Sequence, residues 1–141
     1  MKFTAPKRTA VRQQRQERWR RDRAAAQTLR SGFPRVERMR IDLSFLDRNS
    51  FAPAAQTHIL HPAAQAFFAF PCPYADCEGR FDLSAAVADV VARSADQAEG
   101  SLECSGVRFR DGLHNQSCQL RLQFVLTAHY APDAESEKQR A

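Results

Sequence analysis

Four cysteines constrain the fold of this chain more than any other feature: Cys72, Cys77, Cys104 and Cys118. The first two stand in the segment FPCPYADCEGRFDL with four residues between them, and 13 residues separate the other two. A structural zinc site takes four ligands in a tetrahedron, and a pair two to four residues apart in a tight turn commonly supplies two of them. We therefore predict that the four thiolates hold one structural Zn²⁺.

Strand alternation supports the same ligand set. Every second side chain of a strand lies on the same face. By this count Cys72, Cys104 and Cys118 share a face with large apolar residues of their own segments. We expect the three to converge from the core face at one end of a sheet, where Cys77 joins them from the turn.

The same residues allow other assignments. Four buried free thiols, two disulfides or an iron–sulfur cluster remain open. Disulfides fit poorly with an N-terminus that lacks the apolar core of a secretory signal. Three residues separate His114 from Cys118, a spacing found between zinc ligands, so His114 is an alternative ligand to Cys104. A shell closed by four thiolates leaves no position for a reactive water, so the predicted site is structural.

Hydrophobic periodicity predicts an α+β fold for the body of the chain. Apolar residues alternate with polar ones over 39–45 and 118–130, which is typical of strands with one wet face. A helix is expected to follow Asp82, which is suited to capping it, and to end near Gly100. With further extended segments over 57–60, 65–72 and 101–109, this predicts a small antiparallel sheet of about four strands with one packed helix, in the order ββ-knuckle-αββ.

The positive charge of the chain is concentrated at its N-terminus. Residues 1–40 carry thirteen Lys or Arg against three acidic residues, whereas residues 41–130 have a net charge of −4. Good helix formers extend from Lys7 to Arg30, and Ser31 and Gly32 then end the helical pattern. We predict a basic helical arm over 1–32, a zinc-binding domain over 33–131 and a disordered charged tail over 132–141.

A helix with arginines on most sides is suited to phosphates, and its one Trp is suited to stacking on an unpaired base. With few apolar residues, we expect it to be mobile on its own and to become ordered on an acidic partner or on the acidic body. We predict that this segment binds nucleic acid, and we favour RNA or a ribonucleoprotein over DNA. The residues assigned to it are Arg12, Arg15, Arg18, Trp19, Arg20, Arg21 and Arg23.

Two other functions remain open. The arm also suits an acidic protein surface, which would make the chain an adaptor, and oxidation of the thiols would make it a redox switch. We expect no membrane binding, no small-molecule substrate and no enzymatic activity, because phosphate-binding and nucleophile motifs are absent and His58 and His61 lack a carboxylate at helical spacing. A cytoplasmic location is expected, although the Arg-rich N-terminus also resembles an organellar transit peptide.

Overall fold

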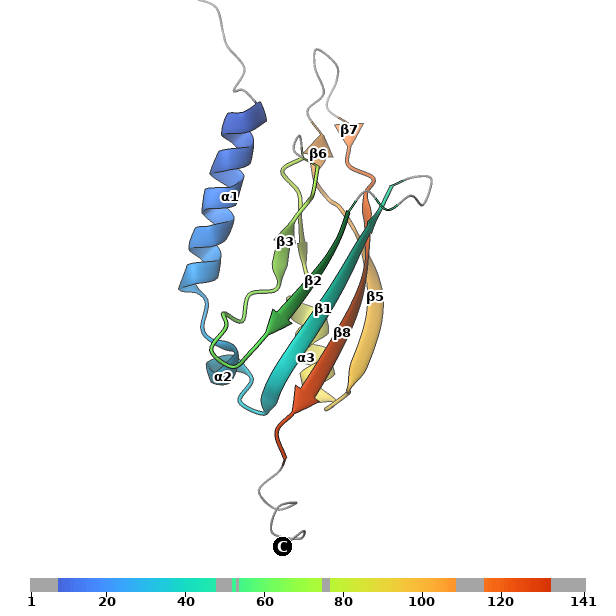
Figure 1. Cartoon of the computed structure of the whole chain (residues 1–141). Helices are drawn as coiled ribbons and strands as arrows, with labels where there is room; N and C mark the ends of the chain where they lie inside the picture. Colours follow the sequence, from blue (N-terminus) through green and yellow to red (C-terminus); the bar gives the residue numbers. More distant parts are fainter. Residues whose placement is uncertain (1–7, 48–51, 53, 75–76, 109–115, 133–141) are drawn as a thin grey trace, which may run out of the picture.

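The computed structural model describes residues 8–47, 52, 54–74, 77–108 and 116–132, and of residues 8–12, 107, 108, 116 and 117 it describes the backbone alone. Two helices precede the first long strand, and the remaining helix lies between two groups of strands (Figure 1). The elements are α1 (Arg8–Ala25), α2 (Leu29–Gly32), β1 (Val36–Leu46), β2 (Ala54–Leu60), β3 (Ala69–Pro71), β4 (Arg80–Asp82), α3 (Ser84–Ala92), β5 (Gln97–Glu103), β6 (Val107–Arg108), β7 (Gln116–Ser117) and β8 (Arg121–Tyr130).

The described residues form an α+β fold around a four-stranded antiparallel sheet, as predicted. The strand order is β2-β1-β8-β5, so the two longest strands lie at its centre. Ile41 of β1 lies between His58 of β2 and Leu126 of β8, which fixes the register of the three strands. Figure 1 shows α3 behind this sheet and α1 beside it, along the hairpin formed by β3 and β4. One face of the sheet therefore carries the core and the other is open.

The core forms where the alternation predicts it. Met39, Ile41, Leu43 and Phe45 of β1 are each at most 1% exposed. The corresponding alternate positions of β8 are also buried, and Val87 and Val90 of α3 pack into the same cluster. Burial of a Leu, Ile or Phe side chain contributes about 1.5 to 3 kcal/mol, so these two strands supply a large share of the hydrophobic stabilisation. The predicted core face of both strands is confirmed.

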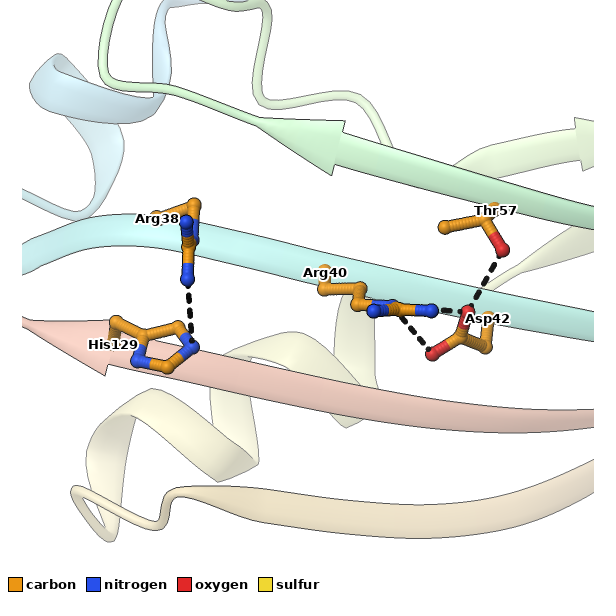
Figure 2. A network of polar contacts seen from close by, with 5 residues as sticks. All are labelled: Arg38, Arg40, Asp42, Thr57 and His129. Carbon is orange, nitrogen blue, oxygen red and sulfur yellow. Dashed lines mark hydrogen bonds and ion pairs between the residues drawn. The ribbon is translucent and has the colours of Figure 1, made fainter.

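Polar side chains contact one another on the open face of the sheet, both within β1 and between neighbouring strands (Figure 2). Asp42 accepts hydrogen bonds from Thr57 Oγ1 at 2.8 Å and from Arg40 Nε at 3.0 Å. Arg38 lies 3.4 Å from the His129 ring, on the neighbouring strand. Exposed contacts of this kind contribute little each, typically below about 1 kcal/mol. These polar and charged side chains keep this face of the sheet in contact with solvent.

The helix after Asp82 is shorter than predicted. Asp82 Oδ1 accepts a hydrogen bond from Ser84 N–H at 2.9 Å, but α3 ends at Ala92. Ser94 then adopts a φ of 50° and donates to Val91 O, while Ala95 donates to Val90 O. This pair of hydrogen bonds is the Schellman arrangement that ends a helix. The chain turns into β5, so the predicted helix end near Gly100 is wrong.

Two other predicted elements are divided in the structure. The arm breaks after α1, because Gln27 O and Leu29 N bond to the backbone of residues 66 and 64 instead of continuing the helix. The extended segments over 65–72 and 101–109 do not run unbroken: β3 pairs with β4 outside the main sheet, and the chain leaves β5 before β6 begins. Cys72 follows the end of β3 and Cys104 follows the end of β5, and the two cysteines lie in the same cluster.

Candidate metal centre

The four cysteines come from four different places in the chain and meet at one point. Cys72 directly follows β3, Cys77 precedes β4, Cys104 follows β5 and Cys118 follows β7. All four side chains are buried, and the four Sγ atoms lie within 4.8 Å of one another. The structure thus brings together the ligand set expected from the sequence. This is the single group of three or more potential ligands among the described residues.

The spacing of the sulfur atoms suits one metal ion. Cys72 Sγ lies 3.8 Å from Cys118 Sγ, and Cys77 Sγ lies 3.6 Å from Cys104 Sγ. Four sulfurs at 2.3 Å from a tetrahedral Zn²⁺ lie about 3.8 Å apart. A disulfide needs about 2.05 Å, and all four thiols are free. A four-iron cluster attaches each thiolate to a different iron atom, which requires a wider spread. The site therefore fits a single tetrahedral ion.

Two turns of the same design hold the sulfurs. Gly79 N–H donates to Cys77 Sγ at 3.3 Å, and Gly106 N–H donates to Cys104 Sγ at 3.4 Å. The carbonyls of the same glycines accept hydrogen bonds of 2.9 Å from the N–H groups of the remaining two cysteines, Cys72 and Cys118. Each glycine thus makes two hydrogen bonds in the site: its N–H donates to one cysteine sulfur, and its carbonyl accepts from the backbone N–H of another cysteine. Amides pointing at sulfur stabilise the thiolate form that a metal requires.

The two glycines also pack against each other. A Cβ added to Gly79 would lie 2.3 Å from Cys104 Sγ, and one added to Gly106 would lie 2.5 Å from Gly79 N and 2.7 Å from Cys77 Sγ. No other residue type fits at either position. The sequence analysis did not assign Gly106. The signal was present, since Cys-x-Gly occurs both at residues 77–79 and at residues 104–106.

The thiols strongly influence one another's ionisation. Hydrogen bonding from Cys72, and then from Cys77, lowers the pKa of the Cys104 thiol to about 4. Hydrogen bonding to Cys104 raises the pKa of both Cys72 and Cys77 above the ordinary thiol value. One thiolate is therefore stabilised at the expense of its neighbours, because several negative charges cannot share a buried site without a cation. A divalent ion would supply that charge.

Helix α1 lies against the turn that holds the first two cysteines. Arg15 donates to Tyr74 O at 3.3 Å, and Trp19 Nε1 donates to Ala69 O at 2.6 Å. Near the end of the helix, Asp22 forms an ion pair with Arg80 at 3.4 Å. The segment that we expected to be mobile on its own is thus packed onto the body in this structure, on the hairpin that carries Cys72 and Cys77. We name this hairpin, residues 69–74 and 77–82, the first knuckle.

The residues assigned to nucleic acid divide into two groups. Arg18, Arg20, Arg21 and Arg23 are exposed, whereas Arg15 and Trp19 are half-buried against the first knuckle. The Trp19 ring lies edge-on to the Phe67 ring, with 6.1 Å between their centroids. The Arg23 guanidinium lies over the Trp19 ring, 5.3 Å from its centroid. Trp19 therefore anchors α1, a role the sequence analysis did not assign. The side chain of Arg12 lies outside the described residues.

The histidines form no second metal site within the described part of the chain. The ring of His58 packs on Phe70, with 4.7 Å between centroids, and lies 3.0 Å from Gln56 Oε1. His61 is exposed. His114, the alternative ligand, lies outside the described residues, as do residues 1–7 of the predicted arm and 133–141 of the predicted tail. The four cysteines alone complete a tetrahedral set.

Comparisons with protein-family models, with curated proteins and with solved structures found no match. Among the described residues, no helix is long and apolar enough to cross a membrane.

Proposed function

We propose that this chain is a non-enzymatic zinc protein that binds nucleic acid through α1. The observation that carries the proposal is the exposure of Arg18, Arg20 and Arg21 on a helix that Trp19 anchors to the first knuckle. Within the described part of the chain, none of these three arginines has a carboxylate at ion-pair distance. Unpaired guanidinium groups on a fixed helix are available for phosphates.

Zinc is the metal we assign to the four cysteines. Two of the sulfur separations, 3.6 and 3.8 Å, agree with a tetrahedral thiolate shell, and thiolate ligands select Zn²⁺ over the harder divalent ions. Four protein ligands leave no open position, so the ion has a structural role. It holds the first knuckle in the conformation on which α1 lies.

RNA is the nucleic acid we favour. The body has a net charge of −4 over residues 41–130, which opposes wrapping of a long duplex around the protein. A single exposed helix face instead suits a local contact with a loop or an unpaired strand, where guanidinium planes stack on splayed bases. Because Trp19 is engaged with Ala69 and Phe67, arginine rather than tryptophan supplies this stacking.

The metal assignment is tested by composition and by substitution. We expect one zinc per chain, measured by atomic absorption on protein purified without added metal. Cys77→Ser should abolish zinc retention and unfold the body, because an incomplete shell loses most of the binding energy, which is about 10 to 16 kcal/mol in small zinc peptides. His114→Ala should retain both zinc and fold. Loss of zinc in the histidine variant would show that the four-cysteine set is wrong.

The nucleic-acid assignment is tested by binding at several salt concentrations with the full chain. Affinity for RNA should fall as salt rises, with a slope that reports several phosphate contacts at about −0.7 each for a single strand. Neutralising the exposed arginines together, as Arg18→Gln, Arg20→Gln, Arg21→Gln and Arg23→Gln, should abolish the salt-dependent part. An intact chain that binds no nucleic acid but retains a polypeptide after nuclease treatment would identify an acidic protein as the partner instead.

A further inference from the structure

A cationic groove separates α1 from the first knuckle. It has a volume of about 420 Å³, and α1 contributes Arg15, Arg18 and Arg21 to its wall. These residues follow one another at three-residue steps, so they lie along one side of the helix and span about 9 Å of its axis. Arg80 and the backbone of Gly79 form the opposite wall. The groove is thus built from two segments that only the folded chain brings together.

The charges of the groove favour an anion. Its four arginines face two carboxylates, those of Glu17 and Glu78. Within the described residues neither carboxylate forms an ion pair with a groove arginine, and Arg80 instead pairs with Asp22 outside the groove lining. The groove therefore has a net charge of +2 and contains guanidinium groups with free hydrogen-bonding capacity.

One buried donor in the groove wall has no partner. Arg15 Nε is buried and forms no hydrogen bond among the described residues, although the same side chain donates through another nitrogen to Tyr74 O. An unsatisfied buried donor is destabilising, and more so when it belongs to a charged group. A small turn of the Arg15 side chain toward the groove would bring this donor within reach of an acceptor there. Phosphate oxygens are the acceptors that a row of guanidinium groups binds best.

We propose that this groove holds the phosphodiester backbone of a single nucleic-acid strand, with Arg15, Arg18, Arg21 and Arg80 on its phosphates. The proposal rests on the proposed function and assigns the place where the strand lies. About 9 Å of helix carrying three arginines accommodates neighbouring phosphates, and a volume of 420 Å³ is too small for a duplex. The bases then extend from the groove toward solvent, so the contact does not depend on sequence.

The test compares two pairs of exposed arginines in the zinc-loaded full chain. Arg18→Gln with Arg21→Gln removes two groove cations, neither of which anchors α1. Arg20→Gln with Arg30→Gln is the matched control, because both residues are exposed and neither lines the groove. The probe is a fluorescein-labelled single-stranded 12-mer of uridine, with the thymidine 12-mer and a duplex of equal length as further arms. Zinc content is measured for each variant.

We expect the groove pair to weaken 12-mer binding at least about tenfold and to reduce the salt slope by about 1.4, the effect of two lost phosphate contacts. The control pair removes one α1 arginine that lies outside the groove, so it should weaken binding less than the groove pair and lower the salt slope by no more than about 0.7, the effect of one lost phosphate contact. Both single strands should bind more tightly than the duplex. In NMR spectra, the Arg15 Nε–H and Gly79 amide signals should move when the 12-mer is added.

Several results would overturn the groove assignment. If both pairs weaken binding equally, or if the Arg15 and Gly79 signals stay in place, α1 binds nucleic acid without the groove and the proposed function stands. If the duplex binds as tightly as the 12-mer, or uridine monophosphate alone does so, the ligand is not a single strand. If the groove pair loses zinc but the control pair does not, these arginines serve the metal centre. A wild-type chain that binds none of the probes overturns the proposed function as well.

Discussion

At the residue scale, the most restrictive contacts are those between two glycines and two sulfurs. Gly79 and Gly106 approach so closely that either Cβ would fall within 2.7 Å of a cysteine sulfur. These neighbours are backbone atoms and buried cysteine sulfurs, which cannot move aside as the end of a flexible side chain can. The same glycines donate the amides that point at the sulfurs. Substitution therefore affects both the packing and the electrostatics of the metal centre.

We expect Gly79→Ala and Gly106→Ala each to lower the free energy of unfolding by about 1 to 3 kcal/mol and to speed zinc release, because the added methyl group overpacks the site. Chelator competition and urea unfolding measure the two effects. Gly32→Ala is the control, since its Cβ would meet only the end of the Gln27 side chain, which is free to rotate away. Equal zinc release rates in all three variants and the wild type would contradict the close approach.

At the scale of the element, α1 is positioned by a small number of directed contacts rather than by a broad apolar face. Trp19 supplies the hydrogen bond to Ala69 O and the ring contact with Phe67, and Gln65 Nε2 donates to the carbonyls of Ala24 and Ala26 at the end of the helix. The helix thus leaves most of its arginines outside. This arrangement also places Arg23 near β2.

The ionisation of His58 reports the position of α1. Burial, and then the nearby charge of Arg23, lowers the pKa of His58 from its usual 6.5. The folded protein therefore disfavours the protonated ring, the unfolded chain binds more protons, and stability is lost as the pH falls below 6.5. An NMR titration of the zinc-loaded protein should show His58 titrating below 6.5.

In the same titration, Arg23→Gln should raise the pKa of His58 by removing the nearby positive charge, whereas Arg20→Gln should leave it unchanged. The size of the difference depends on how much solvent screens the pair. An identical His58 titration in both variants would place the end of α1 away from β2.

At the scale of the whole molecule, the metal centre and the basic helix are one structural unit. The first knuckle carries two of the four clustered cysteines and also Tyr74 O and Ala69 O, the backbone acceptors of Arg15 and Trp19. The groove wall opposite the arginines belongs to the same knuckle. Any change that loosens the cysteines should therefore release α1 and open the groove.

Removal of zinc by a strong chelator should free α1. We expect tryptic cleavage within α1 to accelerate at least about tenfold, because local opening controls proteolysis. The fluorescence of Trp19, the one tryptophan of the chain, should shift to the red as its ring leaves Phe67. Added zinc should reverse both changes. A helix that stays protected in the zinc-free protein would show that its docking is independent of the metal.

The sequence by itself determined which cysteines could act together and which faces of the strands carry the core. Alternation is a local property, so Met39, Ile41, Leu43 and Phe45 had to share one face of any strand that contains them. The four cysteines could be grouped because a structural thiolate site needs four ligands and a pair in a tight turn can supply two of them. The structure brings those four together. The arginines of α1 were equally visible as a cationic segment, although no pattern showed which side of the helix would be covered.

Only the tertiary structure decided where the elements end and what α1 lies against. Hydrogen bonds to residues 64 and 66 break the arm into two helices, and Ser94 ends α3 through its φ of 50°. The contact between Gly79 and Gly106 and the groove beside it join residues far apart in the chain. Such contacts depend on the packing of distant segments, which leaves no periodic trace in the sequence. The physical reason is that hydrophobic periodicity depends on the local conformation of the backbone, whereas a binding surface depends on which distant segments pack against each other.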